Sequence, residues 1–199
     1  MRFSGLGGTD GLQGIRVLLN SGLSGNVQQG HCIINNGGDF TFCGKTRPTG
    51  KGCFDPDIEL LLENGRTVKA RNVRIGDKLY NPLTRSASAV IDIISGPETE
   101  PMIELGFKGY LLKVTRLHPI LTTAGMKRAR TITTEDVVLD AFGTEQIVQY
   151  VKEAPILRNQ RVINFTLHSN STDYRQHLLV GNNVISGDLA VQNSQLEGE

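Results

Sequence analysis

Beyond residue 52 the chain consists of short apolar runs separated by turn residues, and this pattern constrains its fold most strongly. The runs have the length of strands, and pairs such as Asn-Gly, Gly-Asp and Asn-Pro stand between them. In the segment LLLENGRTVKA, Asn64-Gly65 separates two apolar-rich runs, which is the strongest short signal of a β-hairpin. The candidate strands cover residues 58–63, 67–71, 89–95, 102–107, 110–115, 145–151, 161–167 and 177–186. Many short strands with little helical pattern predict an all-β fold, either a sandwich or a compact barrel-like domain.

The composition changes near residue 52, which indicates a boundary. Residues 1–52 hold more than half of the 23 glycines and few apolar residues, so we expect a Gly/Asn-rich arm or the end of a host protein rather than a self-folding domain. Residues 53–193 form the predicted β-domain, and 194–199 form a short tail. Only the segment 129–138 suggests a helical turn, for which Thr133 or Thr134 is the expected cap. We find no internal repeat.

Several classes of protein are disfavoured by the composition. The chain has 199 residues and a formal net charge of +1, so no global field favours binding to nucleic acid. No apolar run reaches the length of a membrane span, and the amino end lacks the pattern of a signal peptide. Three cysteines cannot all pair within one chain, which argues against a disulfide scaffold. The compartment stays open, although a viral or surface-protein context would suit the arm.

Cys53 directly follows the sequence Gly-Lys-Gly and opens the first strand-like run, an unusual place for a packed cysteine. A thiol here can reach the carbonyl carbon of the preceding peptide through a five-membered ring, and Gly52 leaves that carbonyl sterically open. Attack would convert the amide into a thioester, which requires a strained or polarised peptide and a proton for the departing nitrogen. The alternative is a buried or surface thiol that takes part in no reaction.

A second cluster, KVTRLHPIL, has Thr115 and His118 at the end of an apolar run. Imidazole can deliver a proton to a departing amide nitrogen near neutral pH, and a threonine hydroxyl can hydrogen-bond the same peptide. The alternative role of His118 is that of a hydrogen-bonded structural histidine.

Two further groups of residues raise the question of a metal site. His168, Asp173 and His177 lie in a loop-like segment and lack the i, i+3 or i, i+4 spacing of ligands on one helix face. His31, Cys32 and Cys43 could form a zinc site, but ten residues separate the two cysteines and the chain has no C-x-x-C. We therefore expect no metal and no cofactor, and Cys32 and Cys43 as exposed thiols or as a disulfide.

Together these segments resemble the Hint domain, which is shared by inteins, bacterial intein-like proteins and the autoprocessing part of hedgehog proteins. CFDPDIELLLENGRTVKARNVRIGDKL (53–79) is similar to the opening block of that family: a cysteine, an acidic turn, a strand, an Asn-Gly turn, a strand and a V-x-x-G-D turn. VTRLHPIL (114–121) resembles its T-x-x-H block. INFTLHSNSTDYRQHLLVGNNVIS (163–186) resembles the closing blocks more loosely, with His177 before the penultimate strand.

The resemblance covers about two thirds of the chain and implies a compact Hint-type β fold with a self-processing reaction. By this resemblance, Cys53 would attack the Gly52 carbonyl and His118 would protonate the Cys53 nitrogen as it leaves. Thr115 would hold that amide in place. The upstream segment 1–52 would be the substrate, and the acceptor of its acyl group would be water, a thiol, an amine or an alcohol.

The carboxyl end departs from splicing inteins, which end in His-Asn followed by Ser, Thr or Cys. The matching place reads Gly187-Asp188, and the later pair Asn193-Ser194 follows Gln192 instead of a histidine. We therefore expect cleavage without ligation. One alternative is splicing through Asn193 and Ser194, and another is a degenerate β-module that only binds or scaffolds. The auxiliary candidates are Asp173, His177, Asn193 and Ser194.

Overall fold

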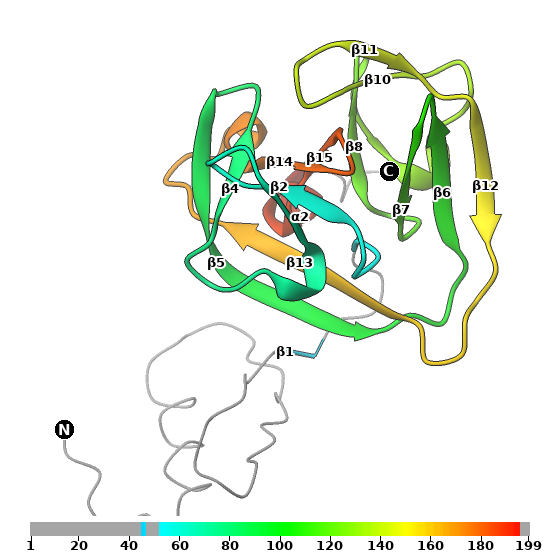
Figure 1. Cartoon of the computed structure of the whole chain (residues 1–199), viewed down its shortest axis with the longest axis horizontal. Coiled ribbons are helices and arrows are strands. Elements are labelled where there is room, and N and C mark those ends of the chain that lie inside the picture. The colour runs from blue at the N-terminus through cyan, green and yellow to red at the C-terminus, as the bar shows by residue number, and fades with distance from the viewer. Residues whose placement is uncertain (1–44, 47–51, 196–199) are drawn as a thin grey trace, which may run out of the picture. The chain divides into compact units, whose positions relative to one another are not determined.

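A computed structural model describes residues 45–46 and 52–195 of the chain, with side chains from 52 to 192. The chain divides into two compact units, Met1–Thr46 and Arg47–Glu199. The first contains the two-residue strand β1 (Lys45–Thr46), and the second contains all the other described elements (Figure 1). The residues considered for a zinc site, His31, Cys32 and Cys43, lie outside the described residues.

The second unit is built almost entirely of antiparallel strands, so the predicted all-β class is confirmed. The strands before residue 115 are β2 (Glu59–Leu61), β3 (Thr67–Lys69), β4 (Lys78–Asn81), β5 (Ser86–Pro97), β6 (Met102–Phe107) and β7 (Tyr110–Val114). The later strands are β8 (Pro119–Thr122), β9 (Gly125–Arg128), β10 (Val137–Leu139), β11 (Glu145–Ile147), β12 (Tyr150–Ala154), β13 (Arg161–Leu167), β14 (Leu178–Gly181) and β15 (Val184–Gly187). The hairpin predicted at Asn64-Gly65 is confirmed, because β2 and β3 pair across it with Gly65 at φ 78°.

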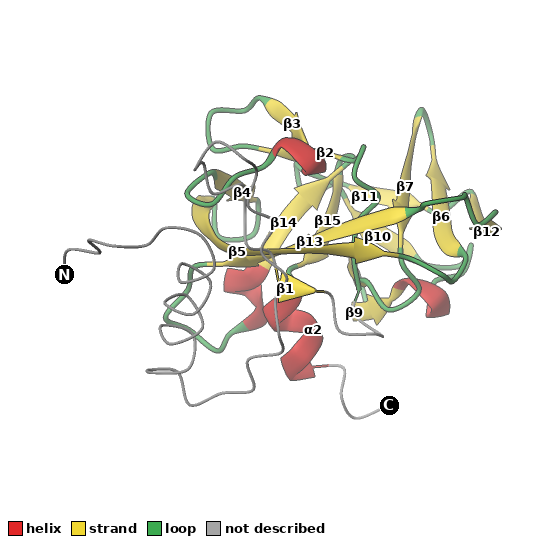
Figure 2. Ribbon diagram, turned by 90° about the horizontal axis from the view of Figure 1, so that it is seen from below, coloured by secondary structure: helices red, strands yellow, loops and turns green. Residues whose placement is uncertain are grey.

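The strands form connected sheets around a shared interior. An eight-stranded sheet runs in the order β11-β10-β8-β15-β14-β2-β3, with β9 added to β8, and β12, β6 and β7 form a three-stranded sheet. The long strand β5 pairs with β4 over residues 86–89 and with β13 over residues 90–97, and Figure 2 shows β5 and β13 side by side. One strand thus joins two parts of the core.

The core sits between these sheets and is centred on aromatic and aliphatic side chains. Phe54 and Phe165 are the largest fully buried side chains, and their ring centroids lie 6.4 Å apart. Strands β6 and β13 are buried along most of their length. Strands that are buried on both faces read as nearly continuous apolar runs, which explains why the sequence predicted their bounds well.

Residues 53–55 form a short extended segment between β7 and β13, in which Phe54 makes β-bridges to Val114 and Ile163. On one side, the Phe54 N–H donates to the Ile163 carbonyl at 2.8 Å, and the Ile163 N–H donates back at 3.1 Å. On the other side, the Asp55 N–H donates to the Lys113 carbonyl at 3.1 Å, and the Thr115 N–H donates to the Cys53 carbonyl at 2.8 Å. These hydrogen bonds fix the start of the β-domain in the interior of the fold.

Two turns that lie far apart in the chain have matching hydrogen bonds. The 3₁₀ turns η1 (Ala70–Asn72) and η2 (Ala129–Thr131) have the same length, and both begin with a buried alanine. The first N–H of η1 donates to the Ile58 carbonyl at 2.8 Å, and the first N–H of η2 donates to the His118 carbonyl at 2.9 Å. The match extends to the residues, because both turns begin with Ala-Arg and an aspartate follows seven positions after each alanine.

Each of these turns leads into a strand through an aspartate. Asp77 accepts a hydrogen bond from the Arg74 N–H at 2.8 Å, and Asp136 accepts one from the Thr133 N–H at 2.9 Å. The helical turn expected at 129–138 is present as η2, but its N-cap is Arg128, so the expected cap at Thr133 or Thr134 is wrong. The segment holds η2, then a tight turn closed by Asp136, and then the β-branched pair that opens β10.

The carboxyl end carries the one α-helix of residues 52–195, α2 (Leu189–Gln195), which the sequence analysis missed. The Asp188 carboxylate caps it by accepting from the N–H groups of Ala190 and Val191 at 2.8 and 3.1 Å. The turn η3 (Tyr174–His177) lies before β14. Within the described part of the chain, no helix is long and apolar enough to cross a membrane.

Candidate active site

The peptide bond between Gly52 and Cys53 has both of its polar groups held by side chains. The Cys53 N–H donates to Thr115 Oγ1 at 2.7 Å, and Asn164 Nδ2 donates to the Gly52 carbonyl oxygen at 2.5 Å. Thr115 directly follows β7 and Asn164 lies in β13, the two strands that flank residues 53–55. Cys53 and Asn164 are 0% exposed, so this peptide is removed from water.

His118 is a buried, uncharged histidine beside the same peptide. Its ring packs on Phe54, with ring centroids 4.1 Å apart, and it is 0% exposed. Burial lowers the pKa of His118 to about 3, and the nearby backbone of Gly52 opposes that shift. No hydrogen bond of normal geometry links either ring nitrogen to the described residues. The ring is therefore neutral at pH 7.

Asn164 is the functional candidate that the sequence analysis missed. Its Oδ1 accepts a hydrogen bond from the Phe165 N–H at 2.8 Å, which orients the amide so that Nδ2 faces the Gly52 oxygen. The available signal was an asparagine between Ile163 and Phe165 in the middle of the run RVINFTL. A polar side chain in such a position needs a partner, and here the partner is the Gly52 carbonyl.

Comparison with solved structures identifies the fold. The chain is similar to the bacterial intein-like domain from Clostridium thermocellum, with 24% identity, a TM-score of 0.59, and coverage of 68% of this chain and 98% of that one. It is also similar to the gp41-1 intein, with 14% identity, a TM-score of 0.57, and coverage of 69% and 98%. A DnaB intein from Synechocystis sp. gives 17% identity, a TM-score of 0.56, and coverage of 69% and 98%. No protein-family model and no curated protein sequence matches the chain.

The domain has the Hint fold of inteins. In this Hint domain the carboxyl end is held by a buried carboxylate. Asp188 is 0% exposed, and its Oδ2 accepts hydrogen bonds from the Leu167 N–H at 2.8 Å and from His177 Nδ1 at 3.1 Å. The hydrogen bond to Asp188 raises the pKa of His177. Together with the two N–H groups of α2, four donors satisfy this carboxylate.

The other auxiliary candidates lie in different surroundings. Asp173 caps η3 and pairs with Arg175 at 2.7 Å. Asn193 and Ser194 lie within α2, and their side chains are outside the described set. Among the described residues, no three metal-binding side chains gather into a cluster, so His168, Asp173 and His177 do not form one site.

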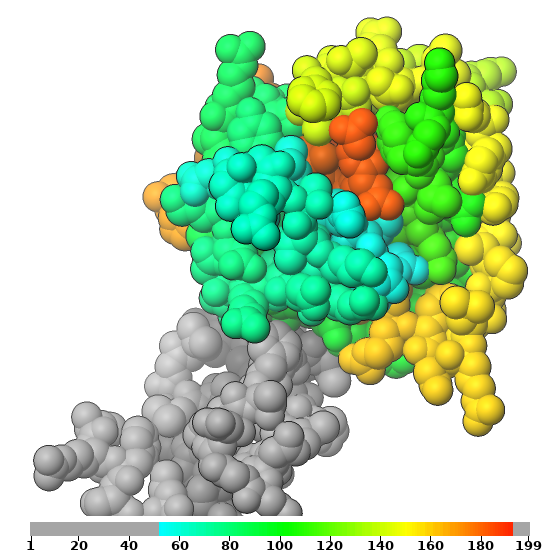
Figure 3. Space-filling model, viewed as in Figure 1, coloured from blue at the N-terminus to red at the C-terminus, as the bar shows by residue number. Residues whose placement is uncertain are grey.

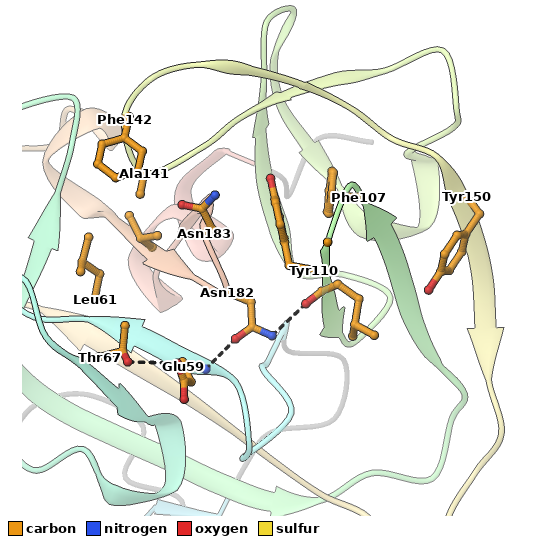
Figure 4. Close-up of a pocket in the computed structure, with 13 residues that line it drawn as sticks. Glu59, Leu61, Thr67, Phe107, Tyr110, Ala141, Phe142, Tyr150, Asn182 and Asn183 are labelled. Carbon is orange, nitrogen blue, oxygen red and sulfur yellow. Dashed lines mark hydrogen bonds between the residues drawn. The ribbon is translucent and has the colours of Figure 1, made fainter.

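An open cleft of about 720 Å³ in the Hint domain is separate from the Gly52–Cys53 peptide (Figure 4). Neither Cys53, Thr115, His118 nor Asn164 lines it. Figure 3 shows the orange-red β14–β15 segment recessed between its neighbours at this place. Asn182 in the cleft donates to the Leu111 carbonyl and accepts from the Glu59 N–H, both at 2.8 Å, and so ties the hairpin turn to β2 and β7.

The pKa values of His118 and His177 should be shifted in opposite directions from the ordinary value. In a Cys53→Ala chain, which keeps the peptide intact, we expect the His118 ring to stay neutral on acidification to about pH 4, since burial lowers its pKa to about 3. The His177 ring should protonate above its ordinary value of 6.5, because Asp188 stabilises the charged form. NMR titration of the ring signals measures both, with His118→Gln and His177→Gln for assignment.

The two shifted pKa values make the stability of the fold depend on pH in opposite ways. The lowered pKa of His118 contributes stability above pH 6.5 that is lost as the pH falls toward 3. The raised pKa of His177 contributes stability below pH 6.5 that is lost as the pH rises through its folded value. A His118 ring that titrates near pH 6.5 would contradict this assignment.

Proposed function

We propose that this Hint domain cleaves its own chain between Gly52 and Cys53. One observation carries the proposal: the peptide that precedes the thiol has its N–H held by Thr115 and its carbonyl held by Asn164, in a site without water contact. These two side chains hold the peptide bond whose cleavage we propose at both of its polar groups. The neutral imidazole of His118 beside it supplies the acid–base group that breaking it requires.

The first step forms the thioester. His118 is neutral at pH 7 and its lowered pKa disfavours a lasting imidazolium, so the ring relays the proton of the Cys53 thiol toward the Cys53 nitrogen during the attack. The sulfur then attacks the Gly52 carbonyl carbon, and the carbonyl oxygen becomes an oxyanion. Asn164 Nδ2, which already donates to this oxygen, stabilises the negative charge.

The second step breaks the carbon–nitrogen bond. The Cys53 nitrogen leaves and takes the proton from the His118 imidazolium, whose low pKa makes it a strong acid. Thr115 Oγ1 accepts the original N–H and so fixes the direction in which the nitrogen lone pair develops. The products are a thioester between Gly52 and the Cys53 sulfur and a free amine on Cys53. Water, a thiol, an amine or an alcohol then takes the acyl group and releases the thiol.

We further propose that the domain does not ligate its two flanks. Asparagine cyclisation, which frees the downstream flank of a splicing protein, needs a side-chain amide, and Asp188 offers a carboxylate committed to four hydrogen bonds. Gly187, in the place of the expected histidine, packs against α2, where a Cβ would lie 2.8 Å from the Val191 Cβ. The residues after 188 thus stay attached.

Substitution of the nucleophile tests this function. Cys53→Ala should abolish cleavage at Gly52–Cys53, because no acyl shift occurs without the thiol. Cys53→Ser should retain a small part of the rate, because a hydroxyl closes the same ring and forms an ester. Intact-mass measurement with and without added thiol reads both variants, and cleavage of the Cys53→Ala chain at this bond would point to a different agent.

Asn164 should contribute a rate effect of its own. Asn164→Ala should lower the cleavage rate about 100- to 1000-fold, the usual effect of one lost oxyanion donor. Asn164→Asp should be at least as slow, because a carboxylate would face the developing oxyanion. Thr166→Ala, a control on the same strand, should cleave at the parent rate. Equal rates for Asn164→Ala and the parent would remove Asn164 from the mechanism.

A further inference from the structure

We propose that the site processes only upstream segments that end in glycine. This inference rests on the proposed cleavage at Gly52–Cys53 and adds a substrate class to it. The restriction comes from the shape of the backbone opposite Gly52, independently of the easy access that glycine gives to its own carbonyl.

The space beside Gly52 has no room for a side chain. A Cβ on residue 52 would lie 2.6 Å from the His118 Cα, 2.8 Å from the His118 nitrogen and 2.9 Å from the Leu117 carbonyl carbon. All three atoms belong to the backbone, so no change of rotamer relieves the overlap. Each distance is shorter than a Cβ tolerates.

The opposing backbone is anchored on both sides of the contact. The His118 N–H donates to the Thr115 carbonyl at 3.1 Å, and the His118 carbonyl accepts from the Ala129 N–H at 2.9 Å. Strand β8 begins at the next residue. A shift of residues 117–118 away from position 52 would therefore break hydrogen bonds that hold the proton carrier itself.

A shift in the other direction disturbs the reacting atoms. Gly52 would have to move relative to Asn164, whose Nδ2 lies 2.5 Å from its carbonyl oxygen, and Cys53 relative to Thr115 Oγ1. Either movement loses a contact that the proposed reaction uses. The site thus has no low-cost way to accept alanine or a larger residue at position 52.

The domain offers a matched control in Gly106. A Cβ there would meet the Tyr150 ring at 2.0 Å, but this is a side chain on the surface, 39% exposed, and it can turn away. Gly52→Ala and Gly106→Ala thus add the same methyl group, against fixed backbone in one case and a movable ring in the other.

The test has two arms. In the cleaving chain, Gly52→Ala should split roughly 10- to 100-fold more slowly than the parent, the effect of overpacking a rigid site. Gly106→Ala should stay near the parent rate. Gly52→Ala combined with Leu117→Ala should remain slow, because the clash involves no side-chain atom. In an uncleavable Cys53→Ala background, Gly52→Ala should lower the Tm several degrees more than Gly106→Ala does.

The outcomes separate this inference from the proposed function. A parent chain that never splits would refute the cleavage, while the Tm arm would still decide whether the site fits only glycine. A parent that splits, with Gly52→Ala equally fast or faster, would overturn the glycine restriction and leave the cleavage intact. Rescue by Leu117→Ala, or equal slowing in Gly106→Ala, would also overturn it.

Discussion

The insertion of residues 53–55 between β7 and β13 is the contact on which the candidate site depends. Four backbone hydrogen bonds hold this extended segment in the interior. They also fix the position of the preceding Gly52–Cys53 peptide, whose polar groups bond to side chains instead of to a neighbouring strand. Thr115 and Asn164 then meet its N–H and its carbonyl. Side-chain partners can adjust as an amide becomes tetrahedral, whereas a neighbouring strand resists such a change. Burial has the further effect of keeping His118 neutral.

The two ends of the Hint domain differ in their chemistry. At the amino end, the buried polar groups converge on one peptide and leave the His118 nitrogens available. At the carboxyl end, every oxygen of the Asp188 carboxylate is engaged, and the chain continues directly into α2. A charged carboxylate held by four donors is a poor nucleophile and a good helix cap. This asymmetry favours cleavage of the upstream flank over the exchange of two flanks.

Much of the fold could be predicted from the sequence, because buried strands such as β6 and β13 are mostly apolar and the Asn64-Gly65 turn is locally encoded. Strand β9 (GMKR) could not, since only its pairing with β8 makes it a strand. The partner of Gly52, Asn164, lies 112 residues away, and no local pattern reports such a contact. The residues around Cys53, Thr115 and His118 already indicated acyl-shift chemistry in the sequence, and the roles of these three stay predictions. The similarity of η1 and η2 lies in their shared Ala-Arg start and in their matching hydrogen bonds.

The chemical identity of the released end tests the central claim most directly. After incubation with hydroxylamine, we expect mass spectrometry to find an upstream fragment that ends in a Gly52 hydroxamate, together with a fragment that begins with Cys53 carrying a free amine and thiol. Hydroxylamine takes an acyl group from a thioester, so a hydroxamate on Gly52, which no Asn-Gly bond of the chain can give, marks the intermediate itself. A chain that hydroxylamine leaves intact at Gly52–Cys53, or a break at this bond formed equally well in the Cys53→Ala chain, would contradict the claim.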